Sequence, residues 1–570
     1  MFKRSLFRSS LRLLVAPLLL CFCASPLNAD PLDELAGEFW QWRAIEQPLS
    51  SDDVTRVQRP LGWKPDWSPE AVGRYHQQLE RFESRWKTMD PSVWPVSRQV
   101  DYRLIGSALA RIRWELDLNR SWQKDPGFYL DQSVGAYFQL LLPPPPFTAD
   151  RTQQIVATLA SIPSTLRNGE SNLSEPVAPF ARSAIDQLEN IGPRLRQSVH
   201  ELTPGLAPGV DLRALDQATE QAAAALESYR GWLERRLPAM SGATAIGRQQ
   251  YLFFLQRVAL LPFSPEQILA MGREEWARSV ASQSYEEHRN HGVPQLQLFR
   301  DQAEQVAEGA KDELAIRLYL EQKALLTVPP ATPHFRLLAM PAYLAPISSF
   351  GEADDFTSRE RSGEPGIRYV DPPSPRLGYF AFALAEDPRC QIVHEGMPGH
   401  FFQLITSWAN SDPIRRHYYD SGANEGIGFY AEEMMLHAGL FDDSPRTREI
   451  IWNFMRLRAL RVEVDVRLAL GDFTIEQAAQ YLEATVPMDS ATAHGEAAFF
   501  ASTPGQAISY QIGKLEIYRF LADAERKQGA NFNLQAFQDY LWQNGNLPII
   551  LQRWEYLGTN SEMDELANLH

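Results

Sequence analysis

Apolar residues recur at helical spacing along most of this 570-residue chain, and this periodicity limits the fold more than any other feature. Spacings of three and four positions are typical of amphipathic helices. A run of alanines at 222–225 strengthens one of these stretches, because alanine has the highest helix propensity. The sequence therefore predicts a mostly α-helical protein. The periodic stretches are 71–86, 100–116, 151–162, 176–191 and 212–236.

Prolines interrupt the helical pattern at two places. Four consecutive prolines at 143–146 must end any helix, so we expect an extended elbow before the next one. Residues 327–387 contain nine prolines that bound short apolar segments. We expect strands at 335–340 and 376–383, the second as an edge strand that could hold a peptide by main-chain pairing. The sequence thus predicts a small β-sheet just before residue 390.

Composition and charge exclude several classes of protein. The chain is 44% hydrophobic and 22% charged, which excludes disordered and collagen-like proteins. Its 55 basic and 71 acidic residues give a formal net charge of −16. The body of the chain has no basic cluster, so we expect no nucleic-acid partner. Cys390 is the one cysteine far from the N-terminus, which excludes a disulfide framework.

The N-terminus carries the pattern of an export signal. Lys3 and Arg4 open a basic stretch, an apolar run follows at 13–23, and Leu27-Asn28-Ala29 provides a cleavage site. The apolar run is too short to span a bilayer, and no later segment approaches that length. Leu20 and Phe22 precede Cys21 and Cys23, where a lipid-anchored protein needs a small residue. We predict a signal peptide at 1–29 and an exported, periplasmic or secreted protein without a stable membrane span.

Residues 394–400 read His-Glu-Gly-Met-Pro-Gly-His. Zinc-binding HExxH helices place two histidines four residues apart on one face. Here His394 and His400 are six apart, which turns the second side chain by about 240° on an ideal helix. Gly396, Pro398 and Gly399 permit a bulge or break that brings the two imidazoles together. The segment predicts two metal ligands, although it is a weaker signal than an intact HExxH.

A catalytic zinc site needs a third protein ligand and an open position for water. Glu425 follows His400 by 25 residues and begins the segment EGIGFYAE, at 425–432. Glu432 shares its helical face, being seven residues further on. We assign Glu425 as the third ligand and keep Glu432 as the alternative, or as a carboxylate behind a ligand. Without the upstream histidines, such a glutamate pair is typical of a solvated helix face. Glu395, next to His394, is the candidate general base.

Three ordered motifs resemble one bacterial family. HEGMPGH, EGIGFYAE and PGQAISYQIGK (504–514) are similar to the family known as domain of unknown function 885, and PFTADR (146–151) is similar as well. Members are usually regarded as predicted zinc metallopeptidases with a largely helical, neurolysin-like or angiotensin-converting-enzyme-like gluzincin fold. The resemblance implies a large two-lobed helical metallopeptidase with a small β-sheet next to the active site. It implies a helical region at 30–325 and a catalytic region at 326–570, packed around one channel.

The same resemblance implies the roles of individual residues. One Zn²⁺ per chain would be held by His394, His400 and Glu425. Glu395 would act as the general base, and Tyr510 would be the phenol near the carbonyl of a peptide substrate. The set of two histidines and one carboxylate favours zinc without excluding manganese or cobalt.

The chain departs from the family pattern at two places. Ala469 stands where a histidine is frequent, and Ala501-Ser502 stand where an Arg-Tyr pair is frequent. Three functions therefore remain open: a zinc peptidase, a metal-dependent amidase or esterase acting on a non-peptide substrate, and a catalytically degenerate ligand-binding protein. Retention of His394, Glu395, His400 and Glu425 together argues against the third.

Other residues received less specific predictions. Lys514 and Arg519 follow Tyr510 on a predicted helix, where one of them could meet a substrate carboxylate or both could be solvated charges. Cys390 is expected to be a small buried residue. The isolated histidines are expected to be structural, with His437 as the reserve ligand; they are His417, His437 and His494.

Overall fold

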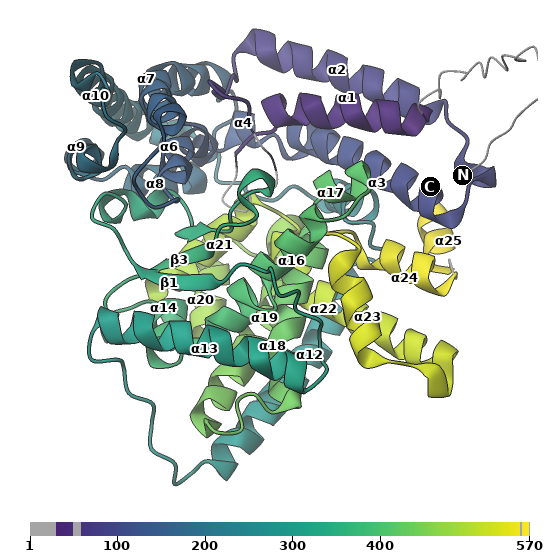
Figure 1. The fold of residues 1–570 in the computed structure, drawn as a ribbon. Helices are drawn as coiled ribbons and strands as arrows, with labels where there is room; N and C mark the ends of the chain where they lie inside the picture. Colours follow the sequence, from purple (N-terminus) through teal and green to yellow (C-terminus); the bar gives the residue numbers. More distant parts are fainter. Residues whose placement is uncertain (1–29, 50–56, 58, 559–560, 569–570) are drawn as a thin grey trace, which may run out of the picture.

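The computed structural model of the protein describes residues 30–49, 57, 59–558 and 561–568. The predicted signal peptide at 1–29 lies outside these residues. The described part of the chain is mostly helical and contains a small three-stranded sheet, as the sequence predicts (Figure 1). None of its helices combines the length and the apolar composition that a bilayer crossing requires.

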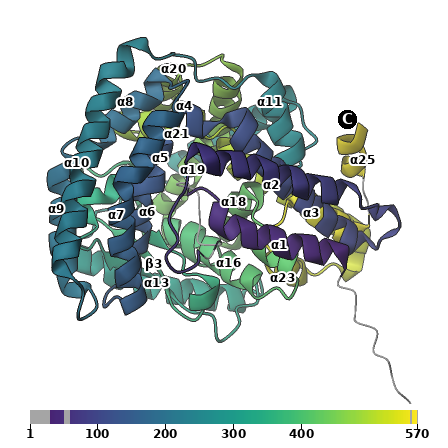
Figure 2. The same cartoon turned by 90° about the horizontal axis from the view of Figure 1, so that it is seen from above.

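The first half of the chain forms two groups of helices. Helices α1 to α3 lie side by side, whereas α7, α9 and α10 form a second group on the other side when the molecule is seen from above (Figure 2). The predicted helix at 212–236 coincides with α10, which begins where the Asp211 side chain accepts hydrogen bonds from the Arg213 and Ala214 amides. The predicted proline elbow separates α6 from α7. The bounds are α1 Pro31–Glu46, α2 Pro69–Lys87, α3 Val96–Arg113, α4 Ser121–Lys124, α5 Pro126–Leu130, α6 Ala136–Leu140, α7 Ala149–Asn172, α8 Ala178–Gln187, α9 Ile191–Leu202, α10 Leu212–Arg236 and α11 Arg248–Phe253.

The second half is built around long helices that pack directly on one another. Helix α19 packs against α12 and α22, and α22 packs against α18. The bounds are α12 Pro265–Arg289, α13 Gln302–Gln322, α14 Tyr379–Glu386, α15 Arg389–Gln391, α16 His400–Trp408, α17 Pro413–His417, α18 Ser421–Ala438, α19 Pro445–Leu470, α20 Ile475–Thr485, α21 Ser490–Ser502, α22 Gln506–Gln528, α23 Leu534–Gln543, α24 Ile549–Leu557 and α25 Ser561–Asn568.

Short helical segments of other types connect these elements. The π-helical turns are η2 Trp114–Asn119, η3 Asp131–Gly135, η6 Phe254–Val258 and η9 Ile392–Gly396. The 3₁₀ turns are η1 Pro91–Val93, η4 Thr203–Gly205, η5 Leu237–Ala239, η7 Ala345–Phe350, η8 Arg359–Arg361 and η10 Gly529–Asn531. The π-helical turn η9 contains part of the HEGMPGH segment, so this segment departs from a regular α-helix.

The sheet has the order β1-β3-β2, with bounds β1 Phe335–Ala339, β2 Asp354–Asp355 and β3 Gly366–Val370. Strand β1 pairs in parallel with β3, and β2 pairs antiparallel with β3. The strand predicted at 335–340 is confirmed. The strand predicted at 376–383 is wrong, because α14 occupies Tyr379–Glu386. An apolar run this short has no periodicity that separates a strand from a buried helix.

The N-terminal helices and the later part of the chain share one hydrophobic core. This core runs from Leu32 in α1 to Leu233 in α10 and includes Tyr369 from β3 and Trp554 from α24. Burial of these apolar side chains ties the sheet and the C-terminal helices to the N-terminal helices. The sheet is thereby fixed between the two halves of the chain.

Candidate metal centre

The HEGMPGH segment brings its two histidines together by leaving the helix between them. His394 lies in η9, Met397 has extended backbone, and His400 is the first residue of α16. The two imidazole rings have centroids 4.7 Å apart. A side chain at Gly399 would place its Cβ 1.7 Å from the His394 carbonyl oxygen, so this tight return requires glycine. The predicted break in the helix is confirmed.

Helix α18 supplies the carboxylates that face these imidazoles. It begins at Ser421, after the Asp420 side chain accepts a hydrogen bond from the Ala423 amide at 2.7 Å. Glu425 therefore lies in its second turn. At Gly428 an added Cβ would lie 2.9 Å from Cε1 of His400 and 3.1 Å from Cε1 of His394. Gly428, the second glycine in EGIGFYAE, therefore lets both imidazole rings lie against the helix.

Ligand atoms of His394, His400 and Glu425 all lie within 4.8 Å of one another. Glu425 Oε2 is 3.3 Å from Nε2 of His400 and 3.6 Å from Nε2 of His394. This oxygen is buried and makes no hydrogen bond within the described residues. Ligands about 2.0–2.1 Å from a tetrahedral zinc lie roughly 3.3–3.4 Å apart, so these distances fit such a site. The donor set of two imidazoles and one carboxylate is that of catalytic zinc sites.

Burial and charge control protonation at these groups. Burial lowers the pKa of His394, but the carboxylates of Glu425 and Glu432 outweigh burial and raise this pKa to about 9. Burial raises the pKa of Glu425, yet the imidazoles of His400 and His394 hold it below its usual range. The carboxylate is therefore ionised and ready to bind a cation.

Glu432 lies behind His394. Its Oε1 is 2.7 Å from His394 Nδ1, on the side of the ring away from Glu425, and it accepts a hydrogen bond from Nη2 of Arg458 at 3.3 Å. Metal-binding histidines commonly have such a carboxylate at the second ring nitrogen, where it orients the ring. Of the two glutamates considered from the sequence, Glu425 is the one that lies beside both Nε2 atoms.

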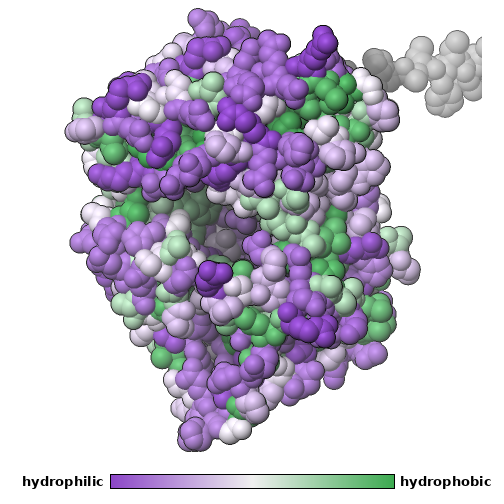
Figure 3. Space-filling view, turned by 90° about the vertical axis from the view of Figure 1, so that its left-hand side faces the viewer, coloured by the Kyte–Doolittle hydropathy of each residue, from purple (hydrophilic) through white to green (hydrophobic). Residues whose placement is uncertain are grey.

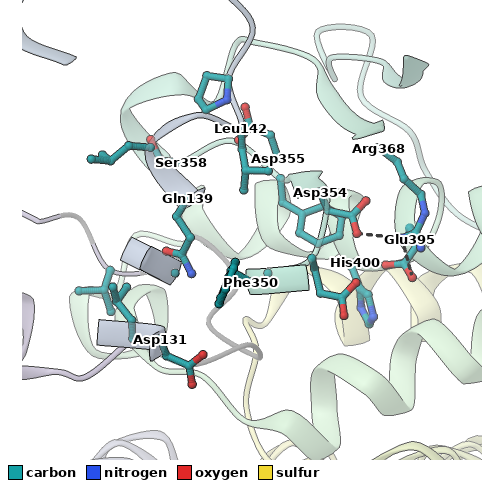
Figure 4. Close-up of a pocket in the computed structure, with 18 of the residues that line it drawn as sticks. Asp131, Gln139, Leu142, Phe350, Asp354, Asp355, Ser358, Arg368, Glu395 and His400 are labelled. Carbon is teal, nitrogen blue, oxygen red and sulfur yellow. Dashed lines mark hydrogen bonds and ion pairs between the residues drawn. The ribbon is translucent and has the colours of Figure 1, made fainter. Parts of the chain in front are cut away.

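Glu395 lies close enough to the two imidazoles to interact with their charge, and it also reaches the sheet. Its Oε1 lies 3.3 Å from Nη1 of Arg368 on β3, which also donates to Asp354 on β2 at 2.8 Å (Figure 4). Burial raises the pKa of Glu395, but Arg368 and the two imidazoles lower it below its usual value. Burial raises the pKa of Asp354 to about 8 although Arg368 opposes this. Glu395 is thus held as an ionised base.

These side chains line one cavity of about 930 Å³. Its walls include Asp131 and Gln139 from the N-terminal helices, as well as the proposed metal ligands and Tyr510. Figure 3 shows a hollow between the upper and lower parts of the molecule. The Tyr510 ring stacks 6.4 Å from the ring of His394. The cavity therefore provides a concave site with a few charged groups, as small-ligand sites do.

Other sequence predictions have mixed outcomes. Lys514 is not a solvated charge, because it is fully buried and donates to Glu433 at 2.7 Å. Arg519 pairs with Glu516 outside the cavity lining. Cys390 is buried, as expected. His417, His437 and His494 do not join the metal group found in the described residues.

The two family departures lie outside the cavity lining. The Ala469 carbonyl accepts a hydrogen bond from the Gly247 amide at 2.9 Å, and Ala501 packs in a separate hydrophobic cluster. Neither position contacts the metal group.

Three arginines at the site were missed by sequence reasoning: Arg368, Arg458 and Arg461. Arg458 and Arg461 interrupt the apolar stretch of α19, and both are buried. The sequence signal that could have identified them is a charged residue on an otherwise apolar helix face. Nothing in the sequence around Arg368 indicates its contact with Glu395, which arises from the position of the sheet.

Comparison with known proteins supports the fold without adding an activity. One similar structure is described as a "putative lipoprotein of unknown function" from Shewanella oneidensis, with TM-score 0.69 and 18% identity over 93% of this chain and 99% of that one. Another is a "putative lipoprotein" from Colwellia psychrerythraea, with TM-score 0.70 and 15% identity over 95% and 100%. No curated protein matches this chain. The family model described as "Bacterial protein of unknown function (DUF885)" matches residues 62–553. The chain therefore belongs to the DUF885 family.

Proposed function

We propose that this protein is an exported zinc-dependent peptidase that hydrolyses short peptides. The observation that carries the proposal is the buried group of His394, His400 and Glu425 on the wall of a large cavity. A zinc ion held by these residues would lower the pKa of a bound water from about 15.7 to about 7 and polarise a carbonyl group. Enclosure in a cavity favours short or extended peptides over folded proteins.

Two further residues of the cavity wall supply the remaining chemistry. The carboxylate of Glu395, kept ionised by Arg368, accepts a proton from the attacking water and passes it to the leaving amine. Tyr510 lies beside His394, where its phenol donates a hydrogen bond to the carbonyl oxygen as negative charge develops. An oxyanion donor of this kind contributes about 2.7–4 kcal/mol to the transition state.

Export of the protein has two lines of support. The first 29 residues carry the basic and apolar pattern of a signal peptide. Two similar structures are described with the words "putative lipoprotein", and lipoproteins are a class of exported proteins. The working compartment we propose is therefore the periplasm or the exterior of a bacterium.

The test combines metal analysis with peptide cleavage. Purified mature protein is analysed for bound metals beside the double variant His394→Ala/His400→Ala, and both are incubated with a mixed peptide library read by mass spectrometry. We expect one zinc per chain, lost in the double variant, together with cleavage that a chelator abolishes. Zinc without peptide cleavage would replace the proposal with a hydrolase of non-peptide substrates. Absence of any metal would leave a ligand-binding protein.

A further inference from the structure

Two buried arginines lie beside the proposed metal site on one face of α19. Arg458 and Arg461 are one helical turn apart, and only 5% and 6% of their surfaces are exposed. Both line the cavity that contains His394 and Glu425. Buried arginines are rare unless they are paired, so the partners of each guanidinium need to be accounted for.

Arg458 has more donors than partners. Its Nη2 donates to Glu432, but its Nε and Nη1 are buried and make no hydrogen bond within the described residues. The guanidinium is packed among aromatic rings, at 4.9 Å from the ring centre of Phe454 and 5.2 Å from that of Phe380. A role as counter-ion of Glu432 accounts for Nη2 alone. Buried donors that are left without an acceptor destabilise a protein, so an acceptor from outside the chain is the simplest explanation for their retention.

Arg461 is paired along one edge of its guanidinium and, unlike Arg458, has no buried nitrogen that lacks a hydrogen bond in the described residues. Its Nε and Nη2 face the carboxylate of Glu496, at 3.0 Å for Nε, and no acceptor in the described residues pairs with Nη1. Its guanidinium carbon lies 4.7 Å from the ring centre of Tyr510. The same tyrosine ring also stacks against the ring of His394. The Tyr510 ring therefore contacts both the Arg461 guanidinium and His394, a proposed metal ligand.

The two sides of the site differ in how fully their arginines are paired. On the Tyr510 side, the cavity wall presents Arg458 and Arg461 among aromatic side chains. On the side of the sheet, His400 packs at 6.2 Å against Phe356, and Arg368 is paired with the carboxylates of both Asp354 and Glu395. The Tyr510 side is therefore the one that suits an anion.

We propose that Arg458 and Arg461 bind a carboxylate of the substrate, and that this carboxylate is the free C-terminus of a short peptide. This inference rests on the proposed function and narrows it to removal of one or two residues from the C-terminal end. A peptide residue spans about 3.3–3.6 Å, so one or two residues match the scale of the 4.7 Å and 6.4 Å contacts that Arg461 and His394 make with the Tyr510 ring. Arginine suits this task because its planar fork matches a carboxylate.

Measurements of peptide binding test this inference independently of catalysis. Glu395→Gln is used as a binding-competent chain that turns over little substrate, and calorimetry compares an acetylated tripeptide acid with the same peptide as its C-terminal amide. We expect the acid to bind about 10- to 100-fold more tightly, the range given by one or two charge-assisted hydrogen bonds. A third peptide, an amide with glutamate in place of glutamine at its last position, tests for recognition of an acidic side chain.

Substitutions then test whether the two arginines cause the preference for the peptide acid over the amide. Arg461→Gln combined with Glu496→Gln removes the cation without leaving a buried unpaired carboxylate, and Arg458→Lys keeps a positive charge beside Glu432 but removes the fork. Both are expected to lower the acid-to-amide ratio at least several-fold in the Glu395→Gln background. Arg467→Gln is the matched control, because Arg467 also pairs with a glutamate on α19 and lies over the Phe473 ring, outside the cavity. The control should keep the ratio.

Each outcome decides a separate point. Equal binding of acid and amide, or a ratio unchanged in both arginine variants, would overturn the carboxylate site. Preference for the glutamate amide over its glutamine counterpart, without an acid preference, would support the site but overturn the C-terminal assignment. An acid preference in a protein that cleaves no peptide would retain the carboxylate site and refute the proposed peptidase function.

Discussion

A carboxylate oxygen buried between two imidazole nitrogens needs positive charge nearby. Glu425 Oε2 occupies this position, with nitrogens of His400 and His394 at 3.3 and 3.6 Å. The charge can come from a proton on an imidazole or from a bound cation, because an isolated buried carboxylate is strongly disfavoured. The three residues therefore behave as a unit, and we expect removal of any one of them to weaken metal binding.

The two glutamates of α18 should differ in their effect on metal. Glu425→Ala removes a proposed ligand, so we expect zinc to be lost during dialysis. Glu432→Ala removes the carboxylate behind His394, and metal affinity should fall about 10- to 100-fold without loss of the site. Competition with a chromogenic chelator measures both affinities. Unchanged stoichiometry in Glu425→Ala, with loss in Glu432→Ala, would reverse the two roles.

Glu395→Gln should separate metal binding from turnover. Glu395 lies outside the group of proposed ligands, so the variant is expected to keep its zinc. Peptide cleavage should fall about 100- to 10,000-fold, because glutamine cannot accept the proton of water. Metal content and single-turnover rates are measured on the same preparation, beside Glu386→Gln as a control on α14. Release of zinc from the variant would show that Glu395 is a ligand.

Single residues of the site were predictable where they belong to a local motif. His394, Glu395 and His400 lie within seven residues, so their types and spacing alone indicate a metal site. Arg368 and Arg458 reach this site from distant elements, and no local pattern records such contacts. Lys514 shows the same limit, because its burial against Glu433 depends on how α22 packs against α18.

At the scale of elements, the site depends on how closely α18 approaches the HEGMPGH turn. An added methyl at Gly428 would meet both imidazoles at 2.9 and 3.1 Å, closer than ordinary contact. Alanine also has a helix propensity about 1 kcal/mol better than glycine in a helix interior. In Gly428→Ala the close contact lowers stability and the better helix propensity raises it, whereas only the contact alters the metal site.

We therefore expect Gly428→Ala to fold and to lose metal affinity at least about tenfold, since the rings must move by a few tenths of an ångström. Calorimetric titration with zinc and a thermal melt test both parts. Gly495→Ala on α21 is the matched control, because no atom lies within 4 Å of its added Cβ. It should raise or preserve stability and leave metal affinity unchanged. Wild-type affinity in Gly428→Ala would show that the rings do not rest on α18.

Elements with strong periodicity or flanking prolines were predicted well. The helix at 212–236 and the strand at 335–340 match α10 and β1 closely, because each combines a clear pattern with a defined start. The prediction of a strand at 376–383 was wrong because eight mostly apolar residues fit a buried helix and a strand equally. The turn within HEGMPGH was predicted as a break, but its π-helical and extended geometry follows from packing against α18 and β1.

At the scale of the whole molecule, the cavity is assembled from segments more than 300 residues apart. Asp131 on η3 and Arg461 on α19 line the same cavity, as does Arg368 on β3. The sequence predicted two helical regions around one channel only through family resemblance. Periodicity defines which face of a helix is buried, but it does not specify which distant helix covers that face. The charged pattern of the cavity is therefore a property of the folded chain alone.

Protonation links the metal site to the stability of the whole fold. The pKa of His394 is about 9 in the metal-free protein, above its value of about 6.5 in an unfolded chain. The protonated imidazole thus stabilises the folded state fully below about pH 6.5, and this contribution is lost as pH rises through about 9. A shift of this size corresponds to at most about 3 kcal/mol. The melting temperature of the chelated protein should fall across this window.

Metal binding should show the opposite dependence, because a ligand imidazole must be neutral. At pH 7 zinc has to displace the His394 proton, so about one proton is released per zinc from this residue, and affinity should rise up to about tenfold per pH unit toward pH 9. Calorimetric titrations in buffers of different ionisation enthalpy count the released protons. His394→Gln should flatten the stability profile of the chelated protein. Binding enthalpies at pH 7 that do not vary with buffer would contradict a protonated His394, and with it the charge balance that keeps Glu425 ionised in the absence of metal.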